Sequence, residues 1–326
     1  MSSGTGRRRA LRIADWVIIC GLCVTALLSL SDRLPAAPWW WALLGQTRPQ
    51  LMAAAVVATA WLLARERRIW TSIALAVALL NLAVLAPFYF DQESGATPDQ
   101  TLSVLHLNTS RGAADLSGVE SFAADLVFLQ EVTPELERQL REGSSSYRLV
   151  RSEPRDDTRG SALLIRTDSP LEVLGSERHQ LLSDHNRPLL SVEISFAGRR
   201  IQLLSLHVIR PRNRSSDAQQ QAEFDAIAAW SRQQIARDKE VVLVGDFNAT
   251  PWSRRFKEFL SDSQTRDSMP GFGIQNSWAG PFPIWMGLPI DHATCTRGLQ
   301  VIRRQTAAVD GSDHGLLVVE FSVSTP

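Results

Sequence analysis

Residues 13–90 of this 326-residue chain are almost uncharged apart from Asp15, Asp32, Arg33, Arg48 and a cluster at residues 65–68, and this constrains the fold more than any other feature. Two long apolar runs lie there, at residues 14–30 and 69–90, with a shorter run at residues 51–64. A membrane-spanning helix needs about 20 mostly apolar residues, so the two long runs are candidates to cross a bilayer. The sequence therefore predicts a membrane region over residues 13–90, followed by a polar domain.

The middle apolar run is short for a membrane span. At 1.5 Å per residue, residues 51–64 would cover roughly 21 Å, against about 30 Å for the bilayer core. The helix can be extended back through Pro49, which the first turn of a helix tolerates, so that Arg48 reaches the interface. We therefore predict three spans, at about residues 14–30, 48–64 and 69–90; the alternative is that residues 51–64 form an amphipathic or re-entrant piece.

The placement of arginine predicts the orientation in the membrane. One arginine cluster, at residues 7–12, precedes the first apolar run. Another, at residues 65–68, follows the middle run at residues 51–64. Cytoplasmic loops carry the excess of Lys and Arg, so three spans place residues 1–12 inside and everything after Phe90 outside the cytoplasm. A cleaved signal peptide is the rival interpretation of the first run, but residues 29–38 lack a suitable small-residue cleavage site. We expect a multi-pass protein of the cell membrane.

The polar domain, residues 101–326, follows a tether at residues 91–100 and carries 25 basic and 28 acidic side chains. Domains that grip a nucleic acid backbone are usually basic, because their affinity comes from neutralising phosphates. A nucleic acid substrate is therefore disfavoured. Cys295 is the single cysteine of this domain, so a disulfide within it is excluded.

Short apolar segments alternate with amphipathic ones through this domain, which predicts strands and helices in an α/β arrangement. Residues 188–208 alternate strictly and predict a hairpin that turns at Ala197–Gly198. Thr133 and Pro134 have the residue types of a helix cap and first helical position. The other expected strands are 101–108, 126–132, 147–152, 161–166, 171–176, 241–245 and 315–321, and the expected helices are 118–125, 133–142, 215–238 and 253–262.

Polar side chains lie at the ends of several of these apolar strands. They are Asn108, Glu131, His207, Asp246, Asn248, Asp313 and His314. Each alone is also explained by an ordinary role, as a turn residue, a surface acid or a core histidine. Strand ends are, however, where α/β proteins place their chemistry, and the coincidence of so many favours a site. Asp246 and Asn248 are two positions apart, so on an extended segment both side chains would face the same target.

The order of these motifs resembles the endonuclease/exonuclease/phosphatase superfamily, which has the deoxyribonuclease-I-like fold. The resemblance covers about residues 101–323 and rests on Asn108 and the motifs LQE (129–131), SLH (205–207), GDFN (245–248), PID (289–291) and SDH (312–314). It implies a four-layer sandwich of two mixed β-sheets flanked by helices. The apolar N-terminal region makes the layout similar to membrane-anchored bacterial members of the superfamily.

The resemblance also implies roles for the strand-end residues. Glu131 and Asn108, with Asp313 at the edge, would bind Mg²⁺ or Mn²⁺, which prefer carboxylate and amide oxygens. Asp246 would orient or deprotonate the attacking water, and Asn248 would hydrogen-bond the water or the phosphate. His207 and His314 would contact phosphoryl oxygens, each kept protonated by a carboxylate beside it, with Asp291 as the partner of His314.

Two arginines and two further histidines are weaker candidates. Arg159 and Arg210 could contact a substrate phosphate, or they could lie on solvated basic loops. The pair Asp–His occurs three times, but only the pair that ends in His314 lies at the C-terminal end of the domain, where the superfamily carries it. His185 is expected in a loop near the mouth of the site, and His292 in a structural role.

The sequence thus predicts a membrane-anchored, Mg²⁺-dependent hydrolase of phosphoester bonds. Its substrate could be a lipid head group, a sugar phosphate or nucleic acid, and the sequence indicates no protein partner. The alternative is a catalytically silent, membrane-tethered binding module of the same fold. A silent member should have lost at least one strand-end residue, and none is lost here.

Overall fold

The computed structural model describes residues 3–33, 38–90, 100–143, 146–182, 187–280 and 282–323. The chain forms two compact units, one of residues Met1–Pro87 with Trp252–Arg254, and one of residues Phe88–Pro251 with Arg255–Pro326. Most of the tether, residues 91–99, lies outside the described residues.

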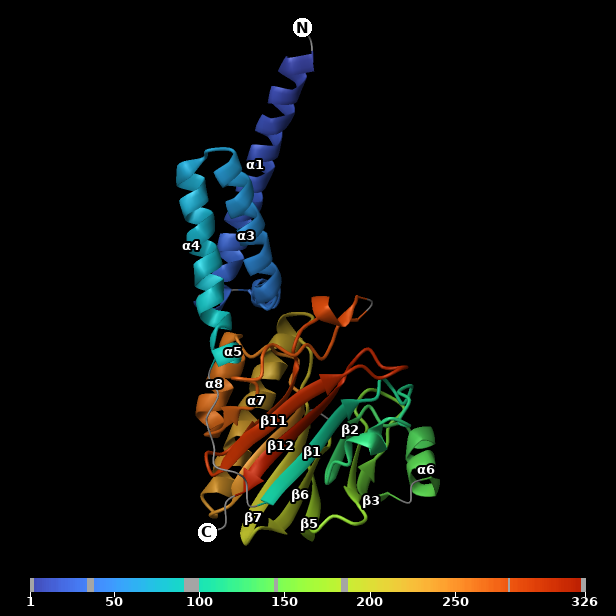
Figure 1. Ribbon diagram of the computed structural model, residues 1–326. Helices are drawn as coiled ribbons and strands as arrows, with labels where there is room; N and C mark the ends of the chain where they lie inside the picture. Colours follow the sequence, from blue (N-terminus) through green and yellow to red (C-terminus); the bar gives the residue numbers. More distant parts are fainter. Residues whose placement is uncertain are drawn as a thin grey trace. The chain divides into compact units, whose positions relative to one another are not determined.

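The N-terminal unit consists of helices (Figure 1). They are α1 (Ser3–Ser29), η1 (Ser31–Arg33), α2 (Trp39–Gly45), α3 (Arg48–Ala64) and α4 (Arg68–Leu85). Small residues let α3 and α4 approach closely, since Ala55, Ala58, Ala74 and Ala78 are buried in one cluster. Two helices of the described chain, Arg8–Arg33 and Arg68–Leu85, are long and apolar enough to cross a membrane, whereas the apolar helix Arg48–Ala64 is shorter.

Buried ionic contacts tie α1 to α3 near both ends of α3. Asp15 of α1 accepts a hydrogen bond from Arg65 Nε at 3.1 Å, next to the C-terminus of α3. Asp32, just beyond α1, pairs with Arg48, the first residue of α3. Arg48 also donates to Asn81 Oδ1 of α4 at 3.1 Å. The buried charges of Asp15 and Arg48 are stable away from water because each has an opposite charge in contact.

The C-terminal unit begins with α5 (Pro87–Phe90) and continues as a sandwich of two six-stranded sheets. The first sheet has the order β11-β12-β1-β2-β4-β3 and the second β5-β6-β7-β8-β10-β9. The first contains β1 (Gln100–Asn108), β2 (Leu126–Gln130), β3 (Tyr147–Glu153), β4 (Ser161–Arg166), β11 (Leu299–Ala307) and β12 (Leu316–Val323). The second contains β5 (Glu172–His179), β6 (Leu189–Phe196), β7 (Arg199–His207), β8 (Glu240–Asp246), β9 (Arg266–Asp267) and β10 (Asp291–Cys295).

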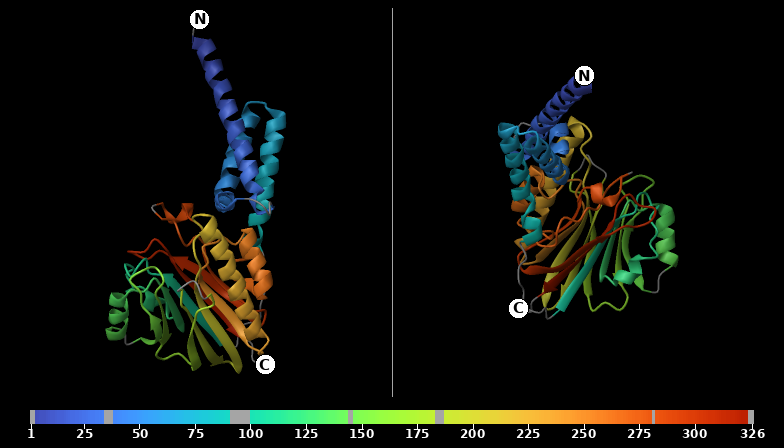
Figure 2. Two further views of the ribbon diagram at one scale, coloured as in Figure 1. Left: turned by 180° about the vertical axis from the view of Figure 1, so that it is seen from behind. Right: turned by 45° about the horizontal axis from the view of Figure 1, so that its top comes forward.

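Helices cover the outer faces of both sheets, which gives the four layers that the superfamily resemblance implied (Figures 1 and 2). Helices α7 (Arg214–Ile235) and α8 (Arg254–Ser263) pack on the second sheet, and α6 (Pro134–Glu142) and the turn η2 (Val119–Phe122) on the first. Thr133 caps α6 as expected, because its hydroxyl accepts from Leu136 N at 3.2 Å. A short turn, η3 (Ile284–Met286), precedes β10.

Each sheet contains one parallel pair, β1 with β2 and β7 with β8, and all its other pairs are antiparallel. Because parallel strands end on the same side, each pair presents two carboxyl ends together. Side chains of these strands alternate between the layer shared by the sheets and the outer face. On β1, Leu102 and Val104 face the shared layer, and the same parity continues to His106 and Asn108. The shared core thus changes from apolar to polar at one end.

The expected hairpin is confirmed. Strands β6 and β7 pair from Phe196 and Arg199 onward, and both turn residues, Ala197 (φ 53°) and Gly198 (φ 73°), have the left-handed backbone of a two-residue hairpin turn. Strands β9, β10 and β11 were not predicted. Strand β10 is a five-residue segment with the polar sequence DHATC, and β11 is an edge strand whose alternation is broken by a bulge between Val301 and Arg303.

Gly245 allows β7 and β8 to meet directly below their polar ends. Its φ is +152°, and a Cβ there would lie 1.9 Å from Leu206 O. We expect Gly245→Ala to lower the melting temperature by roughly 5–10 °C, because a clash with backbone costs on the order of 3 kcal/mol. Gly175→Ala in β5 is the matched control, since a Cβ there meets nothing within 4 Å, and it should shift the melting temperature by less than about 2 °C. Equal shifts for the two variants would contradict this account.

Candidate active site

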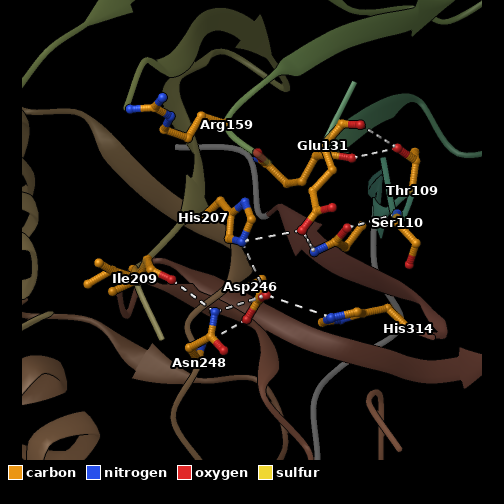
Figure 3. A network of polar contacts seen from close by, with 12 residues as sticks. Thr109, Ser110, Glu131, Arg159, His207, Ile209, Asp246, Asn248 and His314 are labelled. Atoms are coloured by element: carbon orange, nitrogen blue, oxygen red, sulfur yellow. Dashed lines mark hydrogen bonds and ion pairs between the residues drawn. The ribbon is translucent and has the colours of Figure 1, made fainter. Parts of the chain in front are cut away.

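The polar ends of the strands open into one cavity of about 460 Å³. Eight of the ten expected site residues line it: Asn108, Glu131, His207, Arg210, Asp246, Asn248, Asp313 and His314. Figure 3 shows Asp246 between His207 and His314, with Asn248 beside it and Glu131 facing His207. Asp291 is fully buried behind His314. Residues up to 206 positions apart in sequence thus meet because the two parallel pairs end at the same place.

Glu131 follows β2 in a left-handed backbone conformation, with φ 57°. This conformation is unfavourable for a residue with a side chain and is maintained here by the surrounding contacts. Thr109 Oγ1 donates to Glu131 O at 3.0 Å, and Asn108 Nδ2 donates to Glu131 Oε1 at 3.3 Å. Burial raises the pKa of Glu131 above its ordinary value. Asn108 and Glu131 therefore form a hydrogen-bonded pair, and both line the cavity.

Asp246 and Asn248 lie side by side, but not for the reason expected. The segment is not extended, because Asn248 has φ 48°. A tight turn instead joins the two, with Asn248 N donating to Asp246 Oδ1 at 2.8 Å and Asn248 Nδ2 to Asp246 Oδ2 at 3.1 Å. Phe247 is fully buried against other aromatic rings, as expected. Burial, and then the charge of Asp291, raise the pKa of Asp246 to about 7.

Asp291 lies between two imidazoles. Its Oδ2 is 2.9 Å from His314 Nδ1, which agrees with the expected pairing, and its Oδ1 is 3.0 Å from His106 Nε2. Burial opposes the charge of His314, but Asp291, followed by Asp246, raises the pKa of His314 to about 10. His314 is therefore a cation at neutral pH. Its Nε2 lies 3.8 Å from Asp246 Oδ2 and faces the cavity.

His207 differs from the expectation that both imidazoles would be protonated. Its Nε2 lies 3.6 Å from Asp246 Oδ2 and 3.9 Å from Glu131 Oε1. Burial, and then the charges of Arg187 and His314, lower the pKa of His207 to about 3. Nearby carboxylates favour the protonated form of His207, but burial and the two positive charges have the larger effect. His207 is therefore neutral, whereas His314 is charged.

The two expected arginines differ in position. Arg210 lines the cavity, and its guanidinium lies 4.7 Å from the centre of the Trp278 ring, a cation–π distance. Arg159 points away from the Glu131–His207–Asp246 group in Figure 3 and is not among the cavity-lining residues. Its Nε donates to Asp157 at 2.8 Å, so the structure gives no support to the expected phosphate contact.

His292 has the structural role expected of it, because Nε2 contacts Ala249 O at 2.9 Å and the ring packs on Phe256. His185 lies outside the described residues.

Four polar or aromatic neighbours of the site were not predicted from the sequence. Arg187 lines the cavity and donates to His207 O at 3.0 Å. Ser110 and Trp278 both donate to the Asp313 carboxylate, Trp278 through Nε1 at 2.9 Å. His106 precedes Asn108 by two positions on β1, so strand alternation could have revealed it. The other three carry no signal in the sequence, because only the fold brings them to the cavity.

A profile of the endonuclease/exonuclease/phosphatase family matches residues 100–314. The chain belongs to this family. It is accordingly a metal-dependent phosphoester hydrolase, and enzymes of the family use divalent metal ions. The resemblance noted in the sequence is thereby confirmed.

Solved structures show the same fold at low identity. D. rerio TDP2 complexed with a single-strand DNA product has a TM-score of 0.55 and 17% identity, covering 68% of this chain and 99% of that chain. C. elegans TDP2 has a TM-score of 0.56 and 18% identity, with 85% and 94% covered. A Bacteroides vulgatus endonuclease/exonuclease/phosphatase has a TM-score of 0.54 and 16% identity, with 69% and 100% covered. A comparison with curated proteins gave no match.

The cavity has a donor set suited to a divalent cation of this family. Asp246, Asp291 and His314 offer ligand atoms within 4.8 Å of one another. Both Asp291 oxygens, however, already contact imidazole nitrogens, and the Asp291 side chain is fully buried. Glu131 is better placed, because its carboxylate is open to the cavity and its hydrogen bond to Asn108 is long. Hard cations prefer such oxygen donors.

The His314–Asp291 pair should make stability pH-dependent in the metal-free protein. A pKa raised from 6.5 to about 10 stabilises the fold fully below pH 6.5, and this contribution is lost as pH rises to about 10. The difference in melting temperature between wild type and His314→Gln should therefore shrink steadily between pH 6.5 and 10. His179→Gln is the control, because burial lowers the pKa of His179 and leaves it neutral throughout that range. A constant difference for His314→Gln would show that the pair is not ionic.

Proposed function

We propose that this family member hydrolyses phosphoesters with Mg²⁺, or with Mn²⁺ in its place, from a catalytic domain anchored to the membrane. The observation that carries the proposal is the cavity itself, where an open carboxylate, a buried acid with a pKa of about 7, a neutral imidazole and an imidazolium face one another. Such a set of groups, with pKa values moved apart by their surroundings, is typical of hydrolytic acid–base chemistry.

The roles follow from the positions of the side chains. Glu131 and Asn108, with Asp313 at the edge, would hold the metal, which would polarise a phosphoryl oxygen and offset negative charge. Asp246 would take a proton from the attacking water, because its pKa lies near neutral pH, and Asn248 would fix the orientation of its carboxylate.

The two imidazoles would act differently. His314 is a cation with Nε2 toward the cavity, so it would donate a hydrogen bond to a non-bridging phosphoryl oxygen and stabilise the charge that develops there. His207 is neutral and lies between Asp246 and Glu131, where it would hydrogen-bond the phosphoryl group without adding charge. Asp291 would orient His314 and keep it protonated.

The charge of the catalytic domain does not favour a nucleic acid substrate. D. rerio TDP2 was solved with a single-strand DNA product. Residues 101–326 of this chain, with 25 basic and 28 acidic side chains, lack the positive charge expected of a nucleic-acid-binding domain. Four arginines do line the cavity, namely Arg111, Arg187, Arg210 and Arg212, so positive charge is concentrated where a single phosphate group would bind.

Three membrane spans are proposed, with the catalytic domain outside the cytoplasm. Besides the two long helices, α3 has 17 residues, or about 25 Å, which is near the thickness of the bilayer core. Asp15–Arg65 and Asp32–Arg48 join it to α1 near both of its ends, so α3 runs beside α1 over its whole length. A membrane crossed by α1 would then also be crossed by α3. The arginine clusters at residues 7–12 and 65–68 support a cytoplasmic N-terminus.

The metal role of Glu131 is tested by Glu131→Gln, which keeps the shape of the side chain and removes its charge. With the full chain in detergent and a soluble phosphodiester as substrate, turnover should fall by at least about 100-fold and the Mg²⁺ concentration for half-maximal rate should rise. Glu172→Gln, an exposed acid on β5, is the matched control and should behave as wild type. Unchanged activity of Glu131→Gln at limiting Mg²⁺ would remove Glu131 from the site.

The topology is tested with two C-terminal fusions to the full chain. If three helices span the membrane, alkaline phosphatase at the C-terminus should be active, because it folds outside the cytoplasm. A fluorescent protein that folds only in the cytoplasm should be dark at the same position. The opposite pair of results would indicate two spans and a cytoplasmic catalytic domain.

A further inference from the structure

A group of large apolar side chains is exposed on the turn before β10. The exposed fractions are 62% for Phe282, 42% for Ile284, 75% for Trp285 and 42% for Met286. Among the described residues from Gln100 onward, Leu174 is the one other large hydrophobic side chain in this class, at 44%. We call residues 282–287 the apolar loop. Contiguous exposed apolar side chains of this size indicate a surface that meets a partner or a membrane.

The apolar loop is an ordered, compact element. Trp278 and Leu288 pair at its base, with N–O distances of 3.0 and 2.7 Å. Gly287 fits there because a Cβ would lie 2.4 Å from Trp278 O. At the tip, Met286 N donates to Pro283 O at 2.9 Å, and Asn276 Nδ2 donates to Ile284 O at 3.0 Å. Backbone groups satisfied in this way can enter an apolar medium at low cost.

The chemistry of the apolar loop favours a bilayer over a protein surface. Residues 268–290 contain no charged side chain. Trp and Phe are the residue types that collect at membrane interfaces, where an aromatic ring lies at the level of the head groups. The same chain carries helices long enough to cross a membrane. The ten residue-to-residue steps from Phe90 to Gln100 reach at most about 35 Å, so the catalytic domain would always have a bilayer close by.

Residues on both sides of the apolar loop line the catalytic cavity. Trp278 precedes the loop and Ile290 follows it, and both line the cavity. Trp278 donates to Asp313 at 2.9 Å and stacks under Arg210. In Figures 1 and 2 the turn before β10, drawn in orange, projects from the sandwich at the end where β1, β2, β7 and β8 terminate. A lipid with its chains beside the apolar loop would therefore have its phosphate next to the arginines of the cavity mouth.

We propose that the apolar loop inserts into the membrane interface and that the substrate is a phosphoester in the head group of a membrane lipid. This inference rests on the proposed hydrolase function. In the reaction one P–O bond of the lipid breaks, the oxygen of water bonds to phosphorus, and the departing oxygen takes a proton. The loop would raise the local concentration of this substrate without taking part in bond breaking.

Insertion is tested without reference to activity. The full chain, with Cys20→Ser and Cys23→Ser, is labelled with bimane at Ile284→Cys and reconstituted into phosphatidylcholine vesicles. Lipids brominated in the acyl chains should quench this probe at least twofold. A probe at Leu174→Cys, equally exposed in the protein, should not be quenched. Absence of quenching at residue 284 would overturn the insertion proposal.

The substrate class is tested by comparing two turnover rates of the full chain with Mg²⁺. One is measured on vesicles of phosphatidylethanolamine and phosphatidylglycerol, and the other on soluble bis(p-nitrophenyl) phosphate. The ratio of lipid to soluble turnover should fall at least tenfold in Phe282→Ser/Trp285→Ser and stay unchanged in Leu174→Ser. An unchanged ratio in the double variant would overturn the role of the apolar loop.

The same comparison separates the two levels of the proposal. If the wild-type protein cleaves the soluble ester but none of the lipids, the lipid substrate is wrong and the hydrolase function stands. If it cleaves neither, the hydrolase function itself is wrong, and the lipid substrate is rejected with it.

Discussion

The buried carboxylate of Asp291 is the interaction on which the site depends. A charge taken fully out of water is stable only when opposite charges or strong donors surround it. Here His314 Nδ1 contacts one oxygen at 2.9 Å and His106 Nε2 the other at 3.0 Å. The contacts link β1 of one sheet to β10 of the other and to the segment before β12. The same ion pair that joins the sheets also maintains His314 as a cation facing the cavity.

Around this pair, the fold holds similar groups in different protonation states. Asp291 is ionised, and its pKa is held low by the imidazoles, whereas burial beside that charge raises the pKa of Asp246 to about 7. His314 is charged and His207 is neutral. Left-handed backbone conformations at Glu131 and Asn248 direct two further polar groups into the same space. Backbone strain of this kind is typical of functional sites, where surrounding contacts maintain it.

The exposed apolar loop and the polar cavity are joined through one side chain. Trp278 lines the cavity, donates to Asp313 and pairs with Leu288 at the base of the loop. The exposed apolar side chains are therefore continuous with a cavity lined by four arginines. Under the proposed lipid substrate, the catalytic domain would need no net positive charge, since attachment would come from apolar contact and not from general electrostatic attraction.

Features that depend on local pattern were predictable from the sequence. Period-two alternation and strand ends predicted the β6–β7 hairpin and Asn108, Glu131, His207 and Asp246, because neighbours along a strand set which side chain faces inward. Strands β10 and β11 lacked that pattern, and the pairing of Asp246 with Asn248 was correct for the wrong reason. Which distant groups meet depends on tertiary packing, as for His106 with Asp291, 185 positions apart, and for Arg187 with the cavity. Tertiary packing also decided that Phe282 and Trp285 are exposed, since an apolar run fits a core equally well until the packing around it is known.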